Sequence, residues 1–374
     1  MLWKDRILAA VMAVVVTAAA TAAVIRFSPE KPRFTPGQLE EGITYEVTGV
    51  PSDEVIALVD GNGAAAELFT FWLYDTCANL QNSYYIDVAA NWDMEAGDGT
   101  TLKDFVREDV FATIKQQLVV ENLAARYGVT LSEGSEASLA ETRAGAIEQL
   151  GEDGYRAELY KLGLSEAGYD RVVRMYLLYQ ALYDAYNTPG SELYADDDVL
   201  HAYAAGVGYI TADHILLPTI DLATREPLPD EEIAANRALA EDILAQLRAS
   251  DDPIALFKEL ADEYSQDTGR LTNPDGYTFT EGRMVESFDA AARALGENEI
   301  SDIVESEYGF HILLRKPLDV AAAADAVRNE YFDILFNAEY ESAEMEVSAV
   351  ADGFDVAALY DALLAAQRTD ADGG

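Results

Sequence analysis

The architecture is set by two short segments, Thr211-Ala212-Asp213-His214-Ile215-Leu216-Leu217 and Tyr308-Gly309-Phe310-His311-Ile312-Leu313-Leu314. Each is a run of branched apolar residues bounded by turn-forming residues, which is typical of a short β-strand. Each carries a histidine at the strand entrance, and the whole chain has only 3 histidines. The matching contexts predict two related strands.

Three further segments lie between these strands, at residues 257–267, 280–291 and 296–306. In this order, the five segments resemble the parvulin family of peptidyl-prolyl cis/trans isomerases over residues 209–317. The resemblance implies an α+β fold in which a small antiparallel sheet is covered by helices. It also implies an enzyme that catalyses rotation about X-Pro bonds without a cofactor or a metal.

The resemblance assigns roles to individual positions. His214 and His311 match two histidines that face each other under the active site and are hydrogen-bonded there. Asp267 falls beside the carbonyl of the susceptible bond, and Ser306 matches a hydroxyl near the histidines. These four residues are the expected catalytic group. The residues expected to bind substrate are Met284, Phe288, Tyr277, Phe279 and Tyr308.

The same residues have structural interpretations that the sequence leaves open. A buried histidine pair serves a fold as well as a reaction. Met284 and Phe288, four residues apart, would share one face of a helical turn and fit an ordinary core. Asp267 also fits a cap for the turn through Thr268 and Gly269.

Two segments depart from the family pattern. Residues 273–277 read Asn-Pro-Asp-Gly-Tyr where many parvulins carry Gly-Gly-Asp-Leu-Gly, whose leucine walls the proline pocket. Tyr277 or Phe279 would replace that wall, and a holdase chaperone that binds proline-containing clients without catalysis is the alternative function. Residues 218–230 contain a single basic residue, Arg225, among several acids, which predicts that phosphorylated substrates are not required.

Residues 7–25 form an uninterrupted run of apolar and small residues, preceded by Lys4 and Arg6. A run of 19 residues approaches the roughly 20 needed to cross a bilayer. A single-pass signal anchor competes with a cleaved secretory signal that ends between Ala18 and Ala23. In either case the positive charges predict a cytoplasmic N-terminus and an extracytoplasmic folded part, attached to the cell membrane or secreted.

The chain is strongly acidic, with 68 Asp and Glu against 25 Lys and Arg and a net charge of -43. Such a charge repels nucleic acid and anionic membrane surfaces, so neither is an expected partner. Acidity keeps an exported or salt-exposed protein soluble, and it also attracts basic client segments. The expected partners are unfolded or partly folded secreted proteins with X-Pro bonds, the membrane through residues 7–25, and a second copy in a homodimer.

Apolar residues recur at helical spacing between residues 102 and 187. The strand expected at residues 55–59 and the helix after it resemble the start of the chaperone domain of SurA-like and PrsA-like foldases. This resemblance implies that segments on both sides of the isomerase domain fold together, with residues 347–354 near residues 55–59. A structural envelope protein is a third function class. The expected divisions are an anchor at 1–27, a linker at 28–52, a helical chaperone domain at 53–205, the parvulin domain at 206–317, and a C-terminal helix, strand and tail at 318–374.

Overall fold

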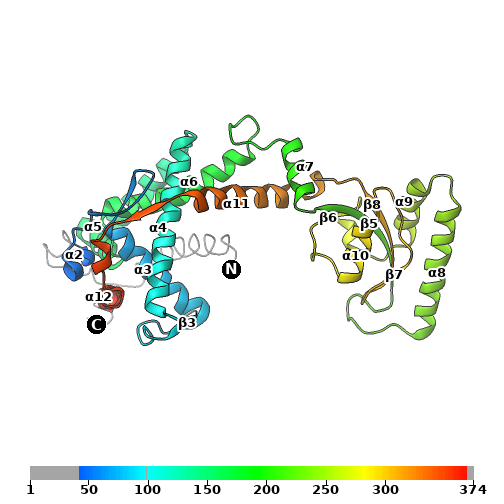
Figure 1. Ribbon diagram of the computed structural model, residues 1–374, viewed down its shortest axis with the longest axis horizontal. Helices are drawn as coiled ribbons and strands as arrows, with labels where there is room; N and C mark the ends of the chain where they lie inside the picture. Colours follow the sequence, from blue (N-terminus) through cyan, green and yellow to red (C-terminus); the bar gives the residue numbers. More distant parts are fainter. Residues whose placement is uncertain (1–41, 98, 369–374) are drawn as a thin grey trace. The chain divides into compact units, whose positions relative to one another are not determined.

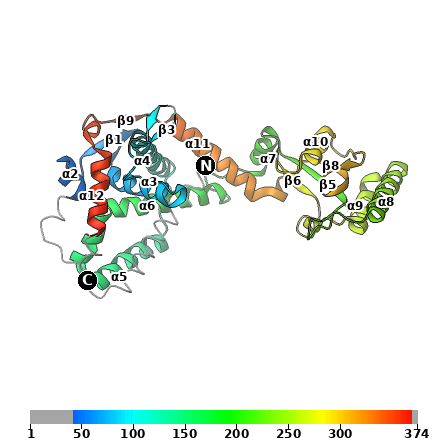
Figure 2. The same ribbon diagram turned by 90° about the horizontal axis from the view of Figure 1, so that it is seen from below.

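The computed structural model describes residues 42–97 and 99–368. They form two compact units, seen in Figures 1 and 2. The continuous unit is Tyr194–Leu335, and the split unit contains the described residues up to Leu193 and from Phe336 onward. The anchor expected at residues 7–25 lies outside the described residues. Among the helices of the described ranges, none is both long and apolar enough to span a bilayer.

An antiparallel sheet of four strands forms the centre of the continuous unit, in the order β6-β5-β8-β7. Its strands are β5 (Ile210–Pro218), β6 (Tyr277–Phe279), β7 (Val304–Glu305) and β8 (Gly309–Lys316). The two histidine segments are the central neighbours β5 and β8, which pair from Thr211 opposite Lys316 to Pro218 opposite Gly309. The predicted α+β class is confirmed.

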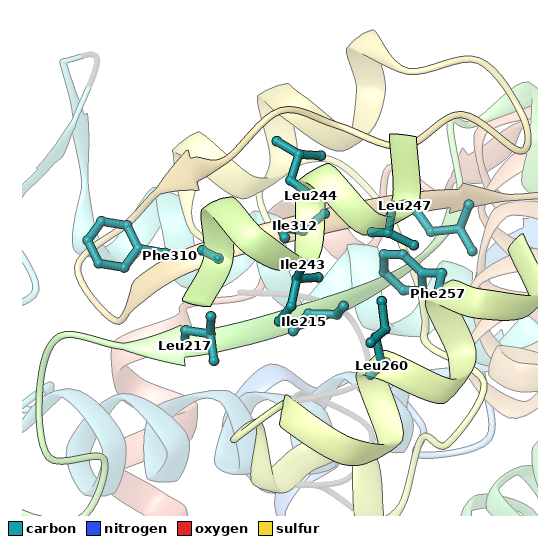
Figure 3. Packing of buried hydrophobic residues seen from close by; sticks show 12 residues of the cluster. Ile215, Leu217, Ile243, Leu244, Leu247, Phe257, Leu260, Phe310 and Ile312 are labelled. Atoms are coloured by element: carbon teal, nitrogen blue, oxygen red, sulfur yellow. The ribbon is translucent and has the colours of Figure 1, made fainter. Parts of the chain in front are cut away.

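Helices α8 (Asp230–Ala249) and α9 (Pro253–Tyr264) cover one face of this sheet. Successive side chains of a strand point to opposite faces, so every second residue of β5 and β8 meets these helices. Figure 3 shows the resulting cluster, in which α8 and α9 pack their apolar faces onto Ile215, Leu217 and Ile312.

The other face of the sheet carries α10 (Glu286–Ala294), which packs Phe288 and Ala292 against Ala212 and Leu313. His214 lies on this face, because it is two residues after Ala212 on β5. His311 lies on the same face, because it is two residues before Leu313 on β8. The 3-10 turn η1 (Thr268–Leu271) connects α9 to the loop before β6.

The continuous unit extends beyond residues 206–317. Leu200 and Ala204 of α7 (Asp197–Gly206) pack with Tyr209 and with Val327, which lies near the start of α11 (Ala324–Ser342). The short helix η2 (Ala321–Ala323) leads into α11.

The split unit is mainly helical. Its described helices are α2 (Gly42–Thr48), α3 (Ala66–Tyr84), α4 (Leu102–Arg126), α5 (Glu133–Lys161), α6 (Glu166–Asn187) and α12 (Val356–Arg368). Its strands are β1 (Val55–Val59), β2 (Asn62–Ala65) and β9 (Met345–Val347), in the order β2-β1-β9, together with the hairpin of β3 (Glu95–Gly97) and β4 (Thr100–Thr101). Local sequence explains two features of these helices. Thr101 and Asp104 form a capping box at the start of α4, and α5 kinks at Gly151.

The expected pairing of the two ends of the chain is confirmed, since Ala57 lies opposite Val347. The strand predicted within residues 318–374 is β9, and it is short. It ends at Val347, and the 3-10 turn η3 (Ala351–Gly353) and α12 follow, because Val356, Leu359 and Leu363 form one buried helical stripe.

Part of the expected linker is helical. Residues 42–48 form α2, in which Ile43 and Thr44 are buried, and the hydroxyls of Thr44 and Thr70 are 2.7 Å apart in a hydrogen bond. The sequence predicted a linker at 28–52, whereas Ile43 and Thr44 hold residues 42–48 against the interior of the split unit.

Candidate functional site

The two histidines of the central strands meet on the α10 face of the sheet. The ring centroids of His214 and His311 are 5.2 Å apart, with the rings at 68°. Both side chains are buried. The predicted hydrogen bond between them is wrong: among the described residues, neither ring nitrogen of His214 nor Nδ1 of His311 has a hydrogen-bond partner. The rings meet edge to face, and the two histidines lie on adjacent strands, with His214 opposite Leu313 and His311 opposite Leu216.

Asp267 lies beside this pair and has three contacts. Its Oδ2 is 3.1 Å from Nε2 of His214, although the ring N–H is not aligned for a hydrogen bond. The Tyr277 hydroxyl donates to Oδ2 over 2.5 Å, and the amide of Gly269 donates to Oδ1 over 3.0 Å. Asp267 therefore caps the turn η1, as one interpretation predicted, and also lies beside His214. Its catalytic role stays a prediction.

These contacts change the acidity of both hydrogen-bonded groups. Burial alone would raise the pKa of Asp267, but His214, the Tyr277 hydroxyl and the Gly269 amide together hold it below its usual range. Burial and the bond to Asp267 raise the pKa of Tyr277. Asp267 is therefore a carboxylate at neutral pH, and Tyr277 is a neutral hydroxyl.

Ser306 holds the second histidine. Its Oγ and Nε2 of His311 are 2.7 Å apart, and Oγ also accepts the Tyr308 amide over 3.1 Å. Burial, followed by the neighbouring His214, lowers the pKa of His311 from 6.5 to about 3, against the opposing effect of Asp267. His311 is a neutral imidazole at physiological pH, so its partnership with Ser306 involves a single ring proton.

Aromatic rings complete the cluster. The Phe288 ring lies 5.1 Å from the ring of His214 and 5.7 Å from that of His311, edge to face in both cases. Phe279 packs 6.0 Å from Phe288. Phe288 and Phe279 are 2% and 4% exposed, while Met284 and Tyr277 pack against them and remain partly exposed. The group thus has a buried floor and an accessible edge.

Two of the predicted positions differ from expectation. Met284 does not lie on a helix: α10 begins at Glu286, with Val285 as its N-cap. The spacing of four predicted a helical turn, but the chain through Gly282, with φ of +77°, turns before the helix begins. Tyr308 is not among the described residues that pack with Phe288, and its ring lies 5.8 Å from the Arg225 guanidinium.

An ion pair that sequence reasoning missed supports the site from the opposite face of the sheet. Arg270 of η1 pairs with Asp213 of β5, and both side chains are buried, at 9% and 6% exposure. Asp213 also accepts the backbone N–H of His214 over 2.7 Å, and Arg270 reaches Asp262 at 2.8 Å. The acid directly before His214 was visible in the sequence, but its partner lies 57 positions away. Within the described ranges, no three His, Cys, Asp or Glu side chains gather as metal ligands.

Lowering the pH below about 6.5 is expected to destabilise the continuous unit. The folded pKa of His311, about 3, lies below its value of 6.5 in an unfolded chain, so between these values only the unfolded chain binds the proton. The free energy of unfolding therefore has its full value with respect to His311 above pH 6.5. It decreases as the pH falls toward 3, by up to about 1.4 kcal/mol per pH unit.

Urea unfolding, followed through NMR signals of β5 and β8, checks this prediction at pH 7.5, 5.5 and 4.5, which lie on both sides of about 6.5. His311→Gln should flatten the dependence in that window, whereas His201→Gln, at an exposed position of α7, should leave it unchanged. Equal slopes for the wild type and His311→Gln would contradict the assignment.

Comparison with known proteins gives a match over the same residues. Residues 214–316 match the family model described as Rotamase, PPIC-type PPIASE domain. The foldase protein PrsA of Halalkalibacterium halodurans is 45% identical over 76 residues, which are 20% of this chain and 22% of that protein. The PrsA foldase of Oceanobacillus iheyensis is 34% identical over 148 residues, 39% of this chain and 41% of that protein.

The crystal structure of PrsA from Bacillus subtilis aligns with 74% of this chain and 91% of that chain, at 22% identity and a TM-score of 0.25. The matched segments span less than half the length of the curated relatives. The match to a PPIC-type rotamase domain runs from His214 within β5 through α8, α9 and α10 to the end of β8, and the matched relatives are PrsA foldases.

Proposed function

We propose that this protein is a peptidyl-prolyl cis/trans isomerase that acts as a foldase on exported proteins. One observation supports it above the others. The residues matched by the rotamase family model bring His214, Asp267, His311 and Phe288 together on one face of the sheet. No bond to a heavy atom forms or breaks in this reaction, so a shaped apolar site with fixed charges suffices, without a cofactor or a metal.

The barrier to be lowered is the roughly 18 to 20 kcal/mol of rotation about the peptide bond. Amide resonance places negative charge on the carbonyl oxygen of the planar states. A carboxylate beside that oxygen disfavours the planar states relative to the twisted one, which is the preference that catalysis requires. Asp267 is charged at neutral pH and is positioned for this role, with Tyr277 and Gly269 fixing its orientation.

The proline ring of the substrate would lie against the aromatic group. In this proposal Phe288 and Phe279 form the floor of the site, and Met284 and Tyr277 form its accessible edge. Tyr277 thereby takes the place of the wall residue that parvulins of the common pattern carry. The layer beneath consists of His214, His311 and Ser306. Because His311 is neutral, no positive charge is buried at its position. Tyr308 is assigned to the outer end of the substrate path.

Substrates in this proposal are not phosphorylated. Arg225, the basic residue of the loop between β5 and α8, stacks on Tyr308, and its neighbours Asp221, Glu226 and Asp230 are acidic. A phosphate would meet repulsion there rather than a cluster of cations.

The proposal includes the setting of the enzyme. Residues 7–25 would anchor the chain in the cell membrane or act as a cleaved signal, with the folded part outside the cytoplasm. The isomerase domain, residues 206–317, would be inserted in a chaperone domain made of residues 53–205 and 318–374, which the β1–β9 pairing supports. Clients are unfolded secreted proteins, and a homodimer is included in the proposal.

The test is cis/trans exchange of an Ala-X-Pro-Phe peptide measured by NMR with the full chain. The wild type should accelerate exchange, and Asp267→Ala and Phe288→Ala should each reduce kcat/KM by about tenfold or more, equivalent to about 1.4 kcal/mol in the transition state. Phe310→Ala is the matched control, because it truncates a buried phenylalanine of the same sheet on the opposite face, and it should retain exchange.

The competing function is a holdase whose rotamase domain binds proline peptides without turnover. It is motivated by the 273–277 segment, which forms a turn around Gly276. If the peptide shifts the NMR signals of Met284 and Phe288 while exchange stays at the uncatalysed rate for several X residues, the holdase replaces the isomerase.

A further inference from the structure

A cavity of about 370 Å³ lies in the split unit, remote in sequence from the rotamase residues. Helices α3, α4 and α6 and the segment around β3 line it. Trp72 and Met175 are buried at 2% and 6% exposure, whereas Tyr84 and Met94 are 51% and 39% exposed. The cavity therefore has a closed apolar part and an open mouth. Its volume is at the lower end of small-ligand pockets, which run from about 300 to 1,000 Å³.

Two carboxylates belong to this otherwise largely apolar lining. Asp75 of α3 and Asp109 of α4 both line the cavity, and burial, followed by the charge of Asp109, raises the pKa of Asp75 to about 6. Asp109 accepts the Thr76 hydroxyl over 3.1 Å. Among the described residues, no hydrogen bond or ion pair engages the Asp75 carboxylate, and the residues that line the cavity include no basic side chain.

A third polar group of the cavity lining lacks a hydrogen-bond partner in the described part of the chain. The hydroxyl of Tyr176, on α6, lines the cavity and is buried, yet no atom of the described residues is its hydrogen-bond partner. Burial and the charge of Asp75 raise the pKa of this hydroxyl well above its usual value. A partly buried acid without a cation and a buried hydroxyl without a partner both cost folding free energy. A ligand that supplies a cationic donor would satisfy both.

We infer that this cavity binds a lysine or arginine side chain, together with an adjacent apolar side chain, from an extended polypeptide. The apolar part holds the aliphatic or aromatic neighbour, and Asp75, Asp109 and Tyr176 hold the cationic head. A neutral apolar ligand would leave Asp75 uncompensated in a low-dielectric site. A free metal ion lacks a ligand set here, because no three candidate metal-binding side chains gather among the described residues. The net charge of -43 favours basic partners over the whole molecule.

The inference rests on the proposed foldase function for the source of the polypeptide, and its test is independent of isomerisation. The probe is a fluorescein-labelled peptide without proline, Gly-Ser-Leu-Arg-Phe-Ser-Gly, compared with the same peptide carrying norleucine in place of arginine. Fluorescence anisotropy with the full chain should show the arginine peptide binding about tenfold tighter, because the attraction between the guanidinium and the carboxylates exceeds the cost of desolvating them.

Asp75→Asn keeps the shape of the side chain and removes the charge, and it should abolish the preference for arginine. It should also raise the unfolding temperature slightly, because it removes a partly buried acid that has no cation beside it among the described side chains. Asp361→Asn, at an exposed position of α12, makes the same change in net charge and should keep the preference. Asp109→Asn is the second variant and should weaken the preference.

Equal affinity of the wild type for the two peptides would overturn the inference, as would an arginine preference that survives both Asp75→Asn and Asp109→Asn. Isomerase activity separates the two proposals. Asp75→Asn should leave the cis/trans exchange rate of a short proline peptide unchanged. Loss of the preference for the arginine peptide with full exchange activity is therefore an effect on the cavity alone.

Discussion

Replacing Arg270 by alanine is expected to lower the free energy of unfolding of the continuous unit by about 3 to 5 kcal/mol. The substitution leaves the carboxylate of Asp213 buried without its cation, at 6% exposure. Burial already raises the pKa of Asp213, and the Arg270 charge is the main effect that opposes it. Urea unfolding followed by NMR signals of β5 and β8 measures the loss.

The control for Arg270→Ala is Arg248→Ala. Arg248 also pairs with an aspartate, Asp302, but the two side chains are 62% and 84% exposed. Exposed pairs contribute at most about 1 kcal/mol, so this variant should be nearly as stable as the wild type. Comparable losses in the two variants would show that burial of the Asp213 pair has no special weight.

Arg270→Ala should also affect the strand that carries His214. Asp213 accepts the backbone N–H of His214. Without Arg270, Asp213 takes up a proton or turns toward water, and β5 is held less firmly under the site. Asp213→Asn with Arg270→Met removes both charges together. This double variant should recover a large part of the stability lost in Arg270→Ala, because replacing both members of a buried pair is far less costly than removing one.

Replacing Gly309 by alanine is expected to cost about 3 to 5 kcal/mol, from backbone strain of about 1 to 3 kcal/mol and steric overlap of similar size. Gly309 has φ of +150° at the first position of β8. A Cβ atom there would lie 2.3 Å from the carbonyl oxygen of Leu217 and 2.6 Å from Cα of Pro218. Both are backbone atoms of β5, so relief requires the two histidine strands to separate.

Gly282→Ala separates strain from overlap. Gly282 also has a positive φ, +77°, but a Cβ atom added there has no heavy atom within 4 Å. Its cost should be about 1 to 2 kcal/mol, the penalty of a left-handed backbone alone. If Gly309→Ala costs no more than Gly282→Ala, the close approach of β8 to β5 does not constrain the sheet.

The sequence predicted the centre of the continuous unit well because its signals are local. Runs of branched residues indicated β5 and β8, and matched histidines indicated that these strands belong together. Resemblance then pointed to positions 267, 288 and 306, which the fold brings to the same histidine pair. Their catalytic roles remain predictions.

Other features depended on contacts between distant residues. Residues 42–48 form a helix whose Ile43 and Thr44 are buried, and no local pattern in the sequence predicted it. Met284 precedes α10 because Gly282 turns the chain, although the spacing to Phe288 fitted a helix. The Asp213–Arg270 pair and the cavity at Asp75 join elements whose proximity follows from tertiary packing, so neither was predicted.

The pairing of β1 with β9 also determines an order of events during synthesis. Ala57 must wait for Val347 before the three-stranded sheet of the split unit is complete, whereas the continuous unit is finished once residue 335 is available. Contacts between residues so distant in the chain form slowly, because the intervening loop must first be closed. We therefore expect a nascent chain to contain a folded continuous unit while β1 still lacks β9, and while α3 and α4 still lack α12. A truncation before residue 345 should leave the continuous unit native and the split unit prone to proteolysis.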